Sequence, residues 1–240
     1  MRTAIVTGGS GGIGSAICRS LCAEGYNVAV CYNSGMDAAE DLVSSLRSKG
    51  YHAWTVHCDV TDEEQVVAAV DEVSAAGELA VAVNCSGVSH IAQIQDMSLL
   101  ELEEIFSVNS SGTYLICREA AKHMIPNGFG RIVNISSMWG VTGGSCETAY
   151  SASKAAVIGL TKALAKELGP SGIAVNCVAP GVINTRMNSV FSEEVMQDLS
   201  EQTPLERIGT PEDVAEAVVY FCRASFVTGQ VLCVDGGFSL

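Results

Sequence analysis

The stretch IVTGGSGGIGSAIC, residues 5–18, decides the fold, and it matches the motifs of two different classes of enzyme. Residues 8–12 match G-x-S-x-G, the turn that presents the nucleophilic serine of a hydrolase, which here would be Ser10. The stretch also matches a glycine-rich turn that receives the phosphates of a dinucleotide, through Gly8, Gly12 and Gly14. Both motifs need a strand before the turn and a helix after it. The flanking residues have both patterns, so the stretch alone leaves the two classes open.

The composition of the chain indicates one domain, residues 1–240, because 48% hydrophobic residues suffice for a sizeable core. The net charge of −14 argues against nucleic acid as a partner, since binding of phosphates needs clustered Lys and Arg. No apolar run approaches the roughly 18 residues of a membrane span, so we expect a soluble protein without a membrane partner.

The ten cysteines are expected to be reduced thiols of a cytoplasmic protein, because Met1 leads straight into a strand pattern and not into a signal peptide. Most of them lie in or beside apolar runs, where cysteine behaves as a small hydrophobic residue. The sequence has no C-x-x-C pair, and its four histidines lack the spacing of zinc ligands. We therefore expect no metal.

Short apolar runs alternate with longer segments of helical periodicity, which is typical of β-α-β units and a parallel sheet. The expected strands cover residues 3–7, 27–32, 52–57, 79–84, 131–136, 173–178 and 231–234. The expected helices cover residues 13–24, 37–49, 62–76, 98–125, 148–168 and 211–223. The predicted fold is α/β: a single Rossmann-type, doubly wound parallel sheet of about seven strands with helices on both faces. Residues 182–210 match neither pattern, and we expect them to form a substrate-binding loop or lid.

A sheet of this kind binds its ligand at the carboxyl ends of the strands. The motif residues that follow predicted strands are Gly8 to Gly14, Asp59, Asn84 to Gly87, Ser136, Ser137, Pro180 and Gly181. An α/β-hydrolase would need its histidine late in the chain, but the last histidine is His123. We therefore expect Ser10 to be a turn residue that faces a phosphate, and a serine hydrolase is the alternative of another class.

Tyr150 and Lys154 lie four residues apart on a predicted helix, so both side chains project from one face. Ser137 follows a predicted strand. Together the three residues supply a proton donor, a cation that would lower the pKa of that donor, and a hydrogen-bond donor for a carbonyl oxygen.

The chain resembles the short-chain dehydrogenase/reductase family along nearly its whole length. The motifs that carry the resemblance, in the family's order, are Thr7-Gly8-x-x-x-Gly12-Ile13-Gly14, Asp59-Val60, Asn84-Cys85-Ser86-Gly87, Asn109, Ser137, Tyr150-x-x-x-Lys154 and Pro180-Gly181-x-x-x-Thr185. The 3-oxoacyl reductases are most similar, also through the segment from Pro204 to Ala215. Two positions depart from the family. Cys85-Ser86 replaces the usual Asn-Ala, and Gly11 replaces the polar residue of many NADP-using members.

The resemblance implies roles for four catalytic residues. Tyr150 would be the general acid in ketone reduction, Lys154 would lower its pKa and hold the nicotinamide ribose, Ser137 would orient the carbonyl oxygen, and Asn109 would anchor a water path. Ser136 competes with Ser137, but the family's spacing to Tyr150 favours Ser137. The residues implied to bind the cofactor are Gly8, Ser10, Gly11, Gly12, Ile13, Gly14, Asn33, Ser34, Asp59, Val60, Asn84, Ser86, Gly87, Tyr150, Lys154, Pro180, Gly181, Ile183 and Thr185.

The end of the second predicted strand bears on the choice of cofactor. NAD-specific sites place an acid there for the ribose 2′-hydroxyl, whereas this chain has Asn33 and Ser34 and no acid before Asp37. Asp37 is more simply a residue at a helix start. An uncharged site does not repel a 2′-phosphate, so we favour NADP, with NADPH as the reductant, and NAD is the alternative.

The predicted function is NADP(H)-dependent reduction of a ketone to a secondary alcohol, most simply of a 3-oxoacyl thioester. The alternative is an enzyme that acts on another small carbonyl or alcohol, including a ketone on a modified protein. The resemblance also implies a homotetramer, built on the helix of Tyr150, the helix before it and the C-terminal strand.

The expected preference for a carrier-bound substrate is weak. Reductases of acyl-carrier-protein substrates place basic residues near the active-site entrance, and the matching positions here are Gly128 and Ser171. Arg131 and Lys122 are the candidates for a small basic patch. Glu147, three residues before Tyr150, is expected either to face the substrate entrance or to be a solvated loop carboxylate.

Overall fold

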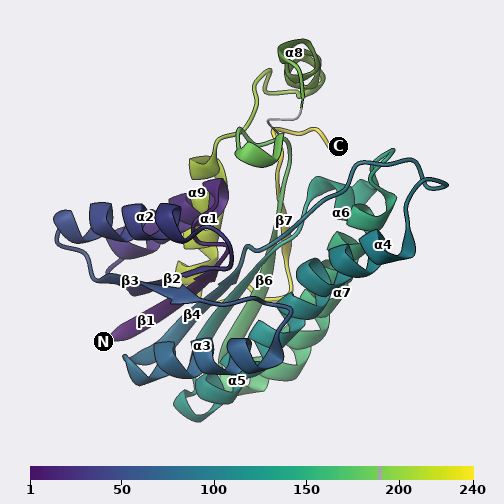
Figure 1. The fold of residues 1–240 in the computed structure, drawn as a ribbon. Coiled ribbons are helices and arrows are strands. Elements are labelled where there is room, and N and C mark those ends of the chain that lie inside the picture. Colours follow the sequence, from purple (N-terminus) through teal and green to yellow (C-terminus); the bar gives the residue numbers. More distant parts are fainter. Residues whose placement is uncertain (189–190) are drawn as a thin grey trace.

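Seven parallel strands form one sheet in the computed structural model, which describes residues 1–188 and 191–240 (Figure 1). The strands are β1 (Arg2–Thr7), β2 (Asn27–Tyr32), β3 (Ala53–His57), β4 (Glu78–Asn84), β5 (Gly130–Ile135), β6 (Ile173–Pro180) and β7 (Val231–Val234). Their order across the sheet is β3-β2-β1-β4-β5-β6-β7, so the strand order reverses between β1 and β4. In open α/β sheets this reversal is where a ligand binds. The predicted fold class is confirmed.

Helices cover both faces of the sheet because successive residues of a strand point to opposite sides. Ala4 and Val6 of β1 pack on one face, beneath α1 (Gly12–Ala23), α2 (Met36–Ser48) and α9 (Pro211–Arg223). Ile5 packs on the other face, beneath α3 (Glu63–Ala75), α5 (Thr113–Asn127) and α7 (Thr148–Leu168). The glycine turn, the catalytic helix and the strand ends thus belong to one continuous body.

The segment predicted as a single helix, residues 98–125, is divided in the structure. It consists of α4 (Leu99–Phe106), a π-helical turn (Ser107–Gly112) and α5. Ser98 begins α4 with a capping box, because its hydroxyl accepts from the Glu101 N–H and the Glu101 carboxylate accepts from the Ser98 N–H. A π turn changes the direction in which its side chains point and is frequent at functional sites, and this one contains Asn109.

Three shorter elements complete the chain: α6 (Met138–Thr142), a 3-10 turn (Gly169–Ser171) and another (Arg186–Asn188). The predicted loop of residues 182–210 also contains a helix, α8 (Glu193–Gln202), which the sequence analysis did not find. α8 has no buried residue and lies apart from the sheet at the top of Figure 1. Ser189 and Val190 of this loop lie outside the described residues. Among the described helices, none is both long enough and apolar enough to span a membrane.

Candidate active site

The glycine turn joins β1 to α1 at the reversal of the strand order. Gly8 has a left-handed backbone (φ 61°), and a side-chain carbon on Gly14 would collide with the Gly8 carbonyl oxygen. Gly11 caps α1 without any side-chain hydrogen bond to the first turn. The amide groups of that turn are therefore available to an anion, so the turn suits a pyrophosphate.

Ser10 is placed as a turn residue and not as a nucleophile. Its Oγ lies 2.7 Å from the point where a side-chain carbon on Gly35 would be, so it faces the turn after β2. Among the hydrogen bonds of the described residues, none joins the Ser10 hydroxyl to a histidine or a carboxylate. Ser10 thus lacks the base that a hydrolase serine requires.

Ser137 and Tyr150 meet at the carboxyl end of β5. Ser137 begins α6, where its Oγ accepts a hydrogen bond from the Trp139 N–H, and it is also hydrogen-bonded to the Tyr150 side chain. The competing Ser136 is turned inward, because its Oγ donates to the Lys154 carbonyl oxygen at 2.8 Å. Of the two serines, only Ser137 contacts the phenol.

Lys154 lies beneath Tyr150 and is 4% exposed. Its Nζ donates to the Ile135 carbonyl oxygen at 3.0 Å and lies 5.7 Å from the centroid of the Tyr150 ring. A side-chain carbon on Gly87 would lie 3.2 Å from that Nζ and 3.3 Å from the Asn109 Oδ1. The structure therefore brings Gly87, Asn109 and Lys154 together around one point.

Asn109 connects this point to two other segments. Its Oδ1 accepts from the Val88 N–H and its Nδ2 donates to the Val88 carbonyl oxygen, both at 2.9 Å. Nδ2 also donates to the Ser153 Oγ at 3.0 Å. Asn109 is fully buried, so all of these bonds are shielded from water. The π turn thus ties the segment after β4 to the catalytic helix α7.

The electrostatics of the pair differ from the expectation that Lys154 lowers the pKa of Tyr150. Burial raises the pKa of Tyr150, the Ser137 hydrogen bond lowers it, and the nearby Glu147 and Cys85 raise it further. Burial likewise lowers the pKa of Lys154, because the ammonium loses its hydration. In this arrangement desolvation shifts the pKa values of Tyr150 and Lys154 more than the interaction between the two side chains does.

The ends of β2 and β3 form the side of the site that the sequence assigns to adenosine. The Asp59 carboxylate accepts from the Thr61 N–H and hydroxyl, at 2.9 and 2.7 Å, and these bonds, together with one from Asn33, lower its pKa. Val60 is buried against Gly112. Asn33 and Asp59 are therefore neighbours, whereas Ser34 is not among the residues bonded to Asp59.

Asn84 is turned away from the cofactor side. Its Nδ2 donates to the Asn134 Oδ1 at 2.8 Å and to the Cys117 Sγ at 3.3 Å, inside the layer beneath α5. The backbone that follows bends around Thr7, whose Oγ1 accepts from the Cys85 N–H at 3.1 Å and the Ser86 N–H at 3.3 Å. Only this bend, and not the Asn84 side chain, faces the glycine turn.

The residues after β6 reach across the site. A side-chain carbon on Gly12 would lie 2.9 Å from the Thr185 Cγ2, so Thr185 stands over the start of α1. The Gly181 N–H donates to the Val234 carbonyl oxygen at 3.0 Å, and Pro180 ends β6. Ile183 is buried in the core and pairs with Gly209, so it supports the site from behind.

Two contacts at the entrance of the site were not predicted from the sequence. The Glu147 Oε2 accepts from the Ser89 Oγ at 2.6 Å, which joins the segment after β4 to the start of α7. The Trp139 and Phe238 rings meet edge to face, with centroids 5.7 Å apart, so the C-terminal turn packs on the loop after Ser137. The position of Glu147 before Tyr150 was the only signal for either contact.

The positions that correspond to carrier-binding basic residues lie elsewhere. Gly128 and Gly172, the neighbour of Ser171, are in close contact at the amino ends of β5 and β6, opposite the end that holds Ser137. Within one subunit they are therefore not at the entrance. Arg131 and Lys122 do not form a joint patch, because Arg131 lies over the Phe129 ring while Lys122 pairs with Glu119 at 2.6 Å.

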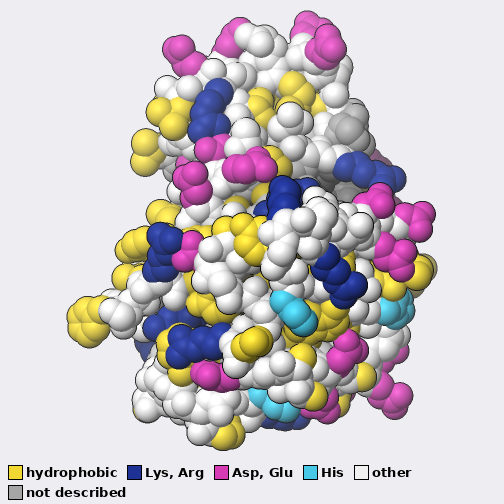
Figure 2. Space-filling view, turned by 90° about the vertical axis from the view of Figure 1, so that its left-hand side faces the viewer, with side chains coloured by type: hydrophobic (Ala, Val, Ile, Leu, Met, Phe, Trp, Pro, Cys, Tyr) yellow, Lys and Arg dark blue, Asp and Glu magenta, His cyan; other side chains and the backbone are white. Residues whose placement is uncertain are grey.

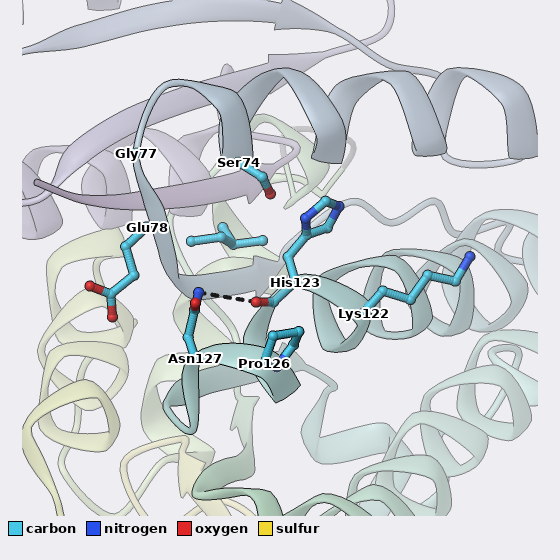
Figure 3. A pocket seen from close by; sticks show the side chains of 8 residues that line it. Ser74, Gly77, Glu78, Lys122, His123, Pro126 and Asn127 are labelled. Carbon is cyan, nitrogen blue, oxygen red and sulfur yellow. Dashed lines mark hydrogen bonds between the residues drawn. The ribbon is translucent and has the colours of Figure 1, made fainter.

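An open hollow of about 570 Å³ is also distant from the catalytic residues. It lies between the ends of α3 and α5 and the start of β4, and Figure 3 shows the His123 ring directed toward Ser74 across it. The charged groups that line it have partners: Glu78 pairs with Arg2, His123 with Asp71 and Lys122 with Glu119. Within the described part of the chain, no three His, Cys, Asp or Glu side chains are grouped as metal ligands.

This arrangement defines a class of protein, and comparison with known proteins agrees. The family model described as enoyl-(acyl carrier protein) reductase matches residues 8–239. A 3-oxoacyl-[acyl-carrier-protein] reductase of Aquifex aeolicus is 40% identical over 98% of this chain and 96% of its own. An uncharacterized oxidoreductase of Bacillus subtilis is 36% identical over 99% and 98%. The chain belongs to the short-chain dehydrogenase/reductase family and is an oxidoreductase.

Solved structures of the family have the same fold. A putative gluconate dehydrogenase from Agrobacterium tumefaciens superimposes with a TM-score of 0.95 at 29% identity, over 99% of this chain and 96% of its own. A gluconate 5-dehydrogenase from Burkholderia cenocepacia, solved with NADP and tartrate, has a TM-score of 0.94 at 30% identity, over 99% and 95%. The names of these relatives and neighbours indicate different substrates, so what the chain shares with them is the family and not one substrate.

Proposed function

We propose that the protein is an NADP(H)-dependent reductase that converts a ketone to a secondary alcohol, with a 3-oxoacyl thioester as its substrate. One observation carries the proposal: the hydrogen-bonded Ser137–Tyr150 pair lies next to a buried Lys154, at the same carboxyl edge of the sheet as an uncapped glycine turn. The substrate class is supported by the names of the 3-oxoacyl relatives.

The residues of the chain have complementary tasks in this reaction. A bound reduced nicotinamide would supply the hydride that reaches the carbonyl carbon. Tyr150 gives its phenolic proton to the carbonyl oxygen as negative charge develops there, and Ser137 donates a hydrogen bond to the same oxygen. Lys154 holds the ribose hydroxyls with its ammonium. Asn109, fixed by Val88 and Ser153, orders the water through which the phenol regains a proton.

The preference for NADP is supported by the chemistry at the end of β2. The chain has no carboxylate at Asn33 or Ser34 to bind a ribose 2′-hydroxyl, and Asp37 lies in the first turn of α2. The gluconate 5-dehydrogenase neighbour was solved with NADP, which is consistent with this choice.

A second candidate function is the reduction or oxidation of another small carbonyl or alcohol, such as a ketone on a modified protein. The specific observation in its favour is Glu147, a carboxylate at the entrance of the site. A carboxylate there does not suit the phosphate-bearing carriers of acyl chains. The gluconate dehydrogenases among the structural neighbours are consistent with a small substrate.

We further propose that the enzyme is a cytoplasmic homotetramer. Small residues on α7 face outward, and their side chains permit close approach of a second helix. They are Ala152, Ala155, Ala156, Gly159 and Ala163. β7 is the edge of the sheet and exposes Leu232 and Cys233. Both surfaces offer a place for another copy of the chain.

The test is consumption of NADPH and of NADH, followed at the absorbance band of the reduced nicotinamide, across a panel of ketones. The panel contains acetoacetyl-coenzyme A, the same acyl group on an acyl carrier protein, and small keto acids and cyclic ketones. We expect the 3-oxoacyl thioesters to have the highest kcat/KM. Turnover of a small ketone at least about tenfold faster than of either thioester would favour the second candidate function.

A further inference from the structure

The carboxylate of Glu147 lies beside the segment that borders the catalytic residues, because it accepts from the Ser89 Oγ and the neighbouring Val88 is bonded to Asn109. Glu147 is the N-cap residue of α7, three residues before Tyr150. The nearby charge of Glu147 also raises the pKa of Tyr150. Glu147 is therefore part of the active-site wall and is not a remote surface group.

Among the ion pairs of the described residues, none involves this carboxylate. Its side-chain hydrogen bond within the described residues is the one from Ser89, at 2.6 Å, and Ser89 is neutral. Two basic groups of neighbouring segments have other partners: Lys154 donates to Ile135, and His90 pairs with Glu104 at 3.2 Å. Burial raises the pKa of Glu147, because part of its hydration is lost without a compensating charge.

The other carboxylates of the described residues that are partly or fully buried have either a cation or at least two N–H or O–H donors. The Asp235 carboxylate, for example, accepts from the N–H groups of Gly237 and Ser239 and from the Ser239 hydroxyl. Glu119, which is 3% exposed, pairs with both Arg118 and Lys122 at 2.6 Å. Asp213 pairs with Arg207 through two bonds of 2.7 and 2.8 Å. A desolvated carboxylate is costly unless it is paired, so the difference at Glu147 needs a reason.

The Trp139 indole and the Glu147 side chain both lie next to Gly144. A side-chain carbon on Gly144 would lie 2.9 Å from the Trp139 Cδ2 and 3.2 Å from the Glu147 Cβ. The Trp139 ring and Glu147 therefore flank one point, on the loop between Ser137 and Tyr150. Phe238 holds the indole by its edge-to-face contact and leaves Trp139 half-buried. An indole face beside a carboxylate is a favourable environment for an organic cation.

We propose that Glu147, Ser89 and Trp139 form a subsite for a positively charged ammonium group on the ketone substrate. The carboxylate supplies the opposite charge, the indole supplies a cation-π contact, and Ser89 fixes the carboxylate. The inference rests on the second candidate function, the reduction of another small carbonyl, and names a substrate class for it: a compact ketone that carries an ammonium group near its carbonyl. It also explains why the chain keeps this carboxylate free of its own cations.

The experiment uses two ketones of the same shape that differ only in charge, 4,4-dimethylcyclohexanone and its cationic isostere 1,1-dimethyl-4-oxopiperidinium. We expect the wild-type enzyme with NADPH to favour the cation by about tenfold or more in kcat/KM. Glu147→Gln retains the size of the side chain and an acceptor for Ser89, and should reduce this ratio about tenfold. Trp139→Leu should reduce it about threefold. Glu167→Gln, an exposed carboxylate on the same helix, is the control and should leave the ratio unchanged.

A binding measurement separates this inference from the proposed function. The chain has two tryptophans, so Trp54→Phe leaves Trp139 as the only indole whose fluorescence can respond to the cation. If neither ketone is reduced, the second candidate function loses its support, while titration of the cation still tests the subsite. A Kd that Glu147→Gln weakens about tenfold supports the subsite. A Kd, or a kcat/KM ratio, that is the same for wild type and Glu147→Gln overturns it.

Discussion

The ammonium of Lys154 donates a hydrogen bond to the backbone carbonyl of Ile135, with 3.0 Å between Nζ and O. Ile135 is the last residue of β5, two residues before Ser137. The same strand end therefore positions both the buried cation and the hydroxyl that contacts Tyr150. Because the strand lies in the middle of the sheet, the relative positions of the three side chains depend on the core and not on a loop.

Lys154→Met should abolish turnover and stabilise the fold. Activity should fall at least about 100-fold, because the ribose and the proton path lose their cation. Burial lowers the pKa of Lys154 below its ordinary 10.5. The buried ammonium therefore destabilises the folded state most at neutral pH, and this destabilisation disappears as the pH rises toward 10.5. The gain in Tm over wild type should therefore be largest near pH 7 and shrink with rising pH. Lys162→Met, at an exposed position, should show no such trend. A variant that is less stable than wild type at every pH would contradict this account.

Ser34→Asp should change the choice of cofactor. A carboxylate after β2 would accept from the ribose 2′-hydroxyl of NADH and repel the 2′-phosphate of NADPH. Ser34 is preferred to Asn33 for this change, because Asn33 is bonded to Asp59. We expect the NADPH-to-NADH ratio of kcat/KM to fall about tenfold or more, measured with one ketone. Ser45→Asp, on the exposed side of α2, is the control. An unchanged ratio would mean that the 2′ position lies elsewhere.

Gly159→Glu should separate the subunits without unfolding them. A side chain on Gly159 meets nothing within 4 Å inside its own subunit, so the change is tolerated by the monomer. In the proposed tetramer it would put a buried charge between two α7 helices. Light scattering should change from about four times the 25.0 kDa of one chain to a smaller species. Gly159→Ala should keep the large species. A wild-type mass of 25.0 kDa at micromolar concentration would refute the tetramer.

The enzyme should discriminate weakly in favour of carrier-bound substrates. Its net charge is −14, and Figure 2 shows acidic side chains distributed over one face, with Lys and Arg interspersed. An acidic carrier would gain no electrostatic steering from such a surface. We expect kcat/KM for one acyl chain to differ by less than about tenfold between acyl carrier protein and coenzyme A. A larger carrier advantage that declines with added salt would reveal a docking patch.

The regular elements could be predicted because their apolar residues follow clear periods. The predicted range 148–168 coincides with α7, and 231–234 with β7. α8 was missed because it has no buried residue and hence no apolar stripe, and α6 because it spans only five residues. The π turn was missed because the helical periodicity continues on both sides of it.

The catalytic residues could be named from motifs, but their contacts could not. Ser89 and Glu147 are 58 positions apart, and no periodicity links them. Asn84 was assigned to the cofactor, yet its side chain bonds Asn134, because β4 and β5 pair these two residues in register. A sequence does not show which face a polar strand residue takes when both faces are buried.

Tyr150→Phe tests the central claim most directly, because it removes only the transferable proton of a residue that is 9% exposed. NADPH binding, followed by fluorescence titration, and the Tm should stay close to wild type, while kcat for the best ketone should fall at least about 100-fold. Tyr220→Phe, at an exposed tyrosine on α9, is the matched control and should retain activity. If Tyr150→Phe binds NADPH and keeps more than about a tenth of the wild-type kcat, Tyr150 is not the proton donor and the mechanism is wrong.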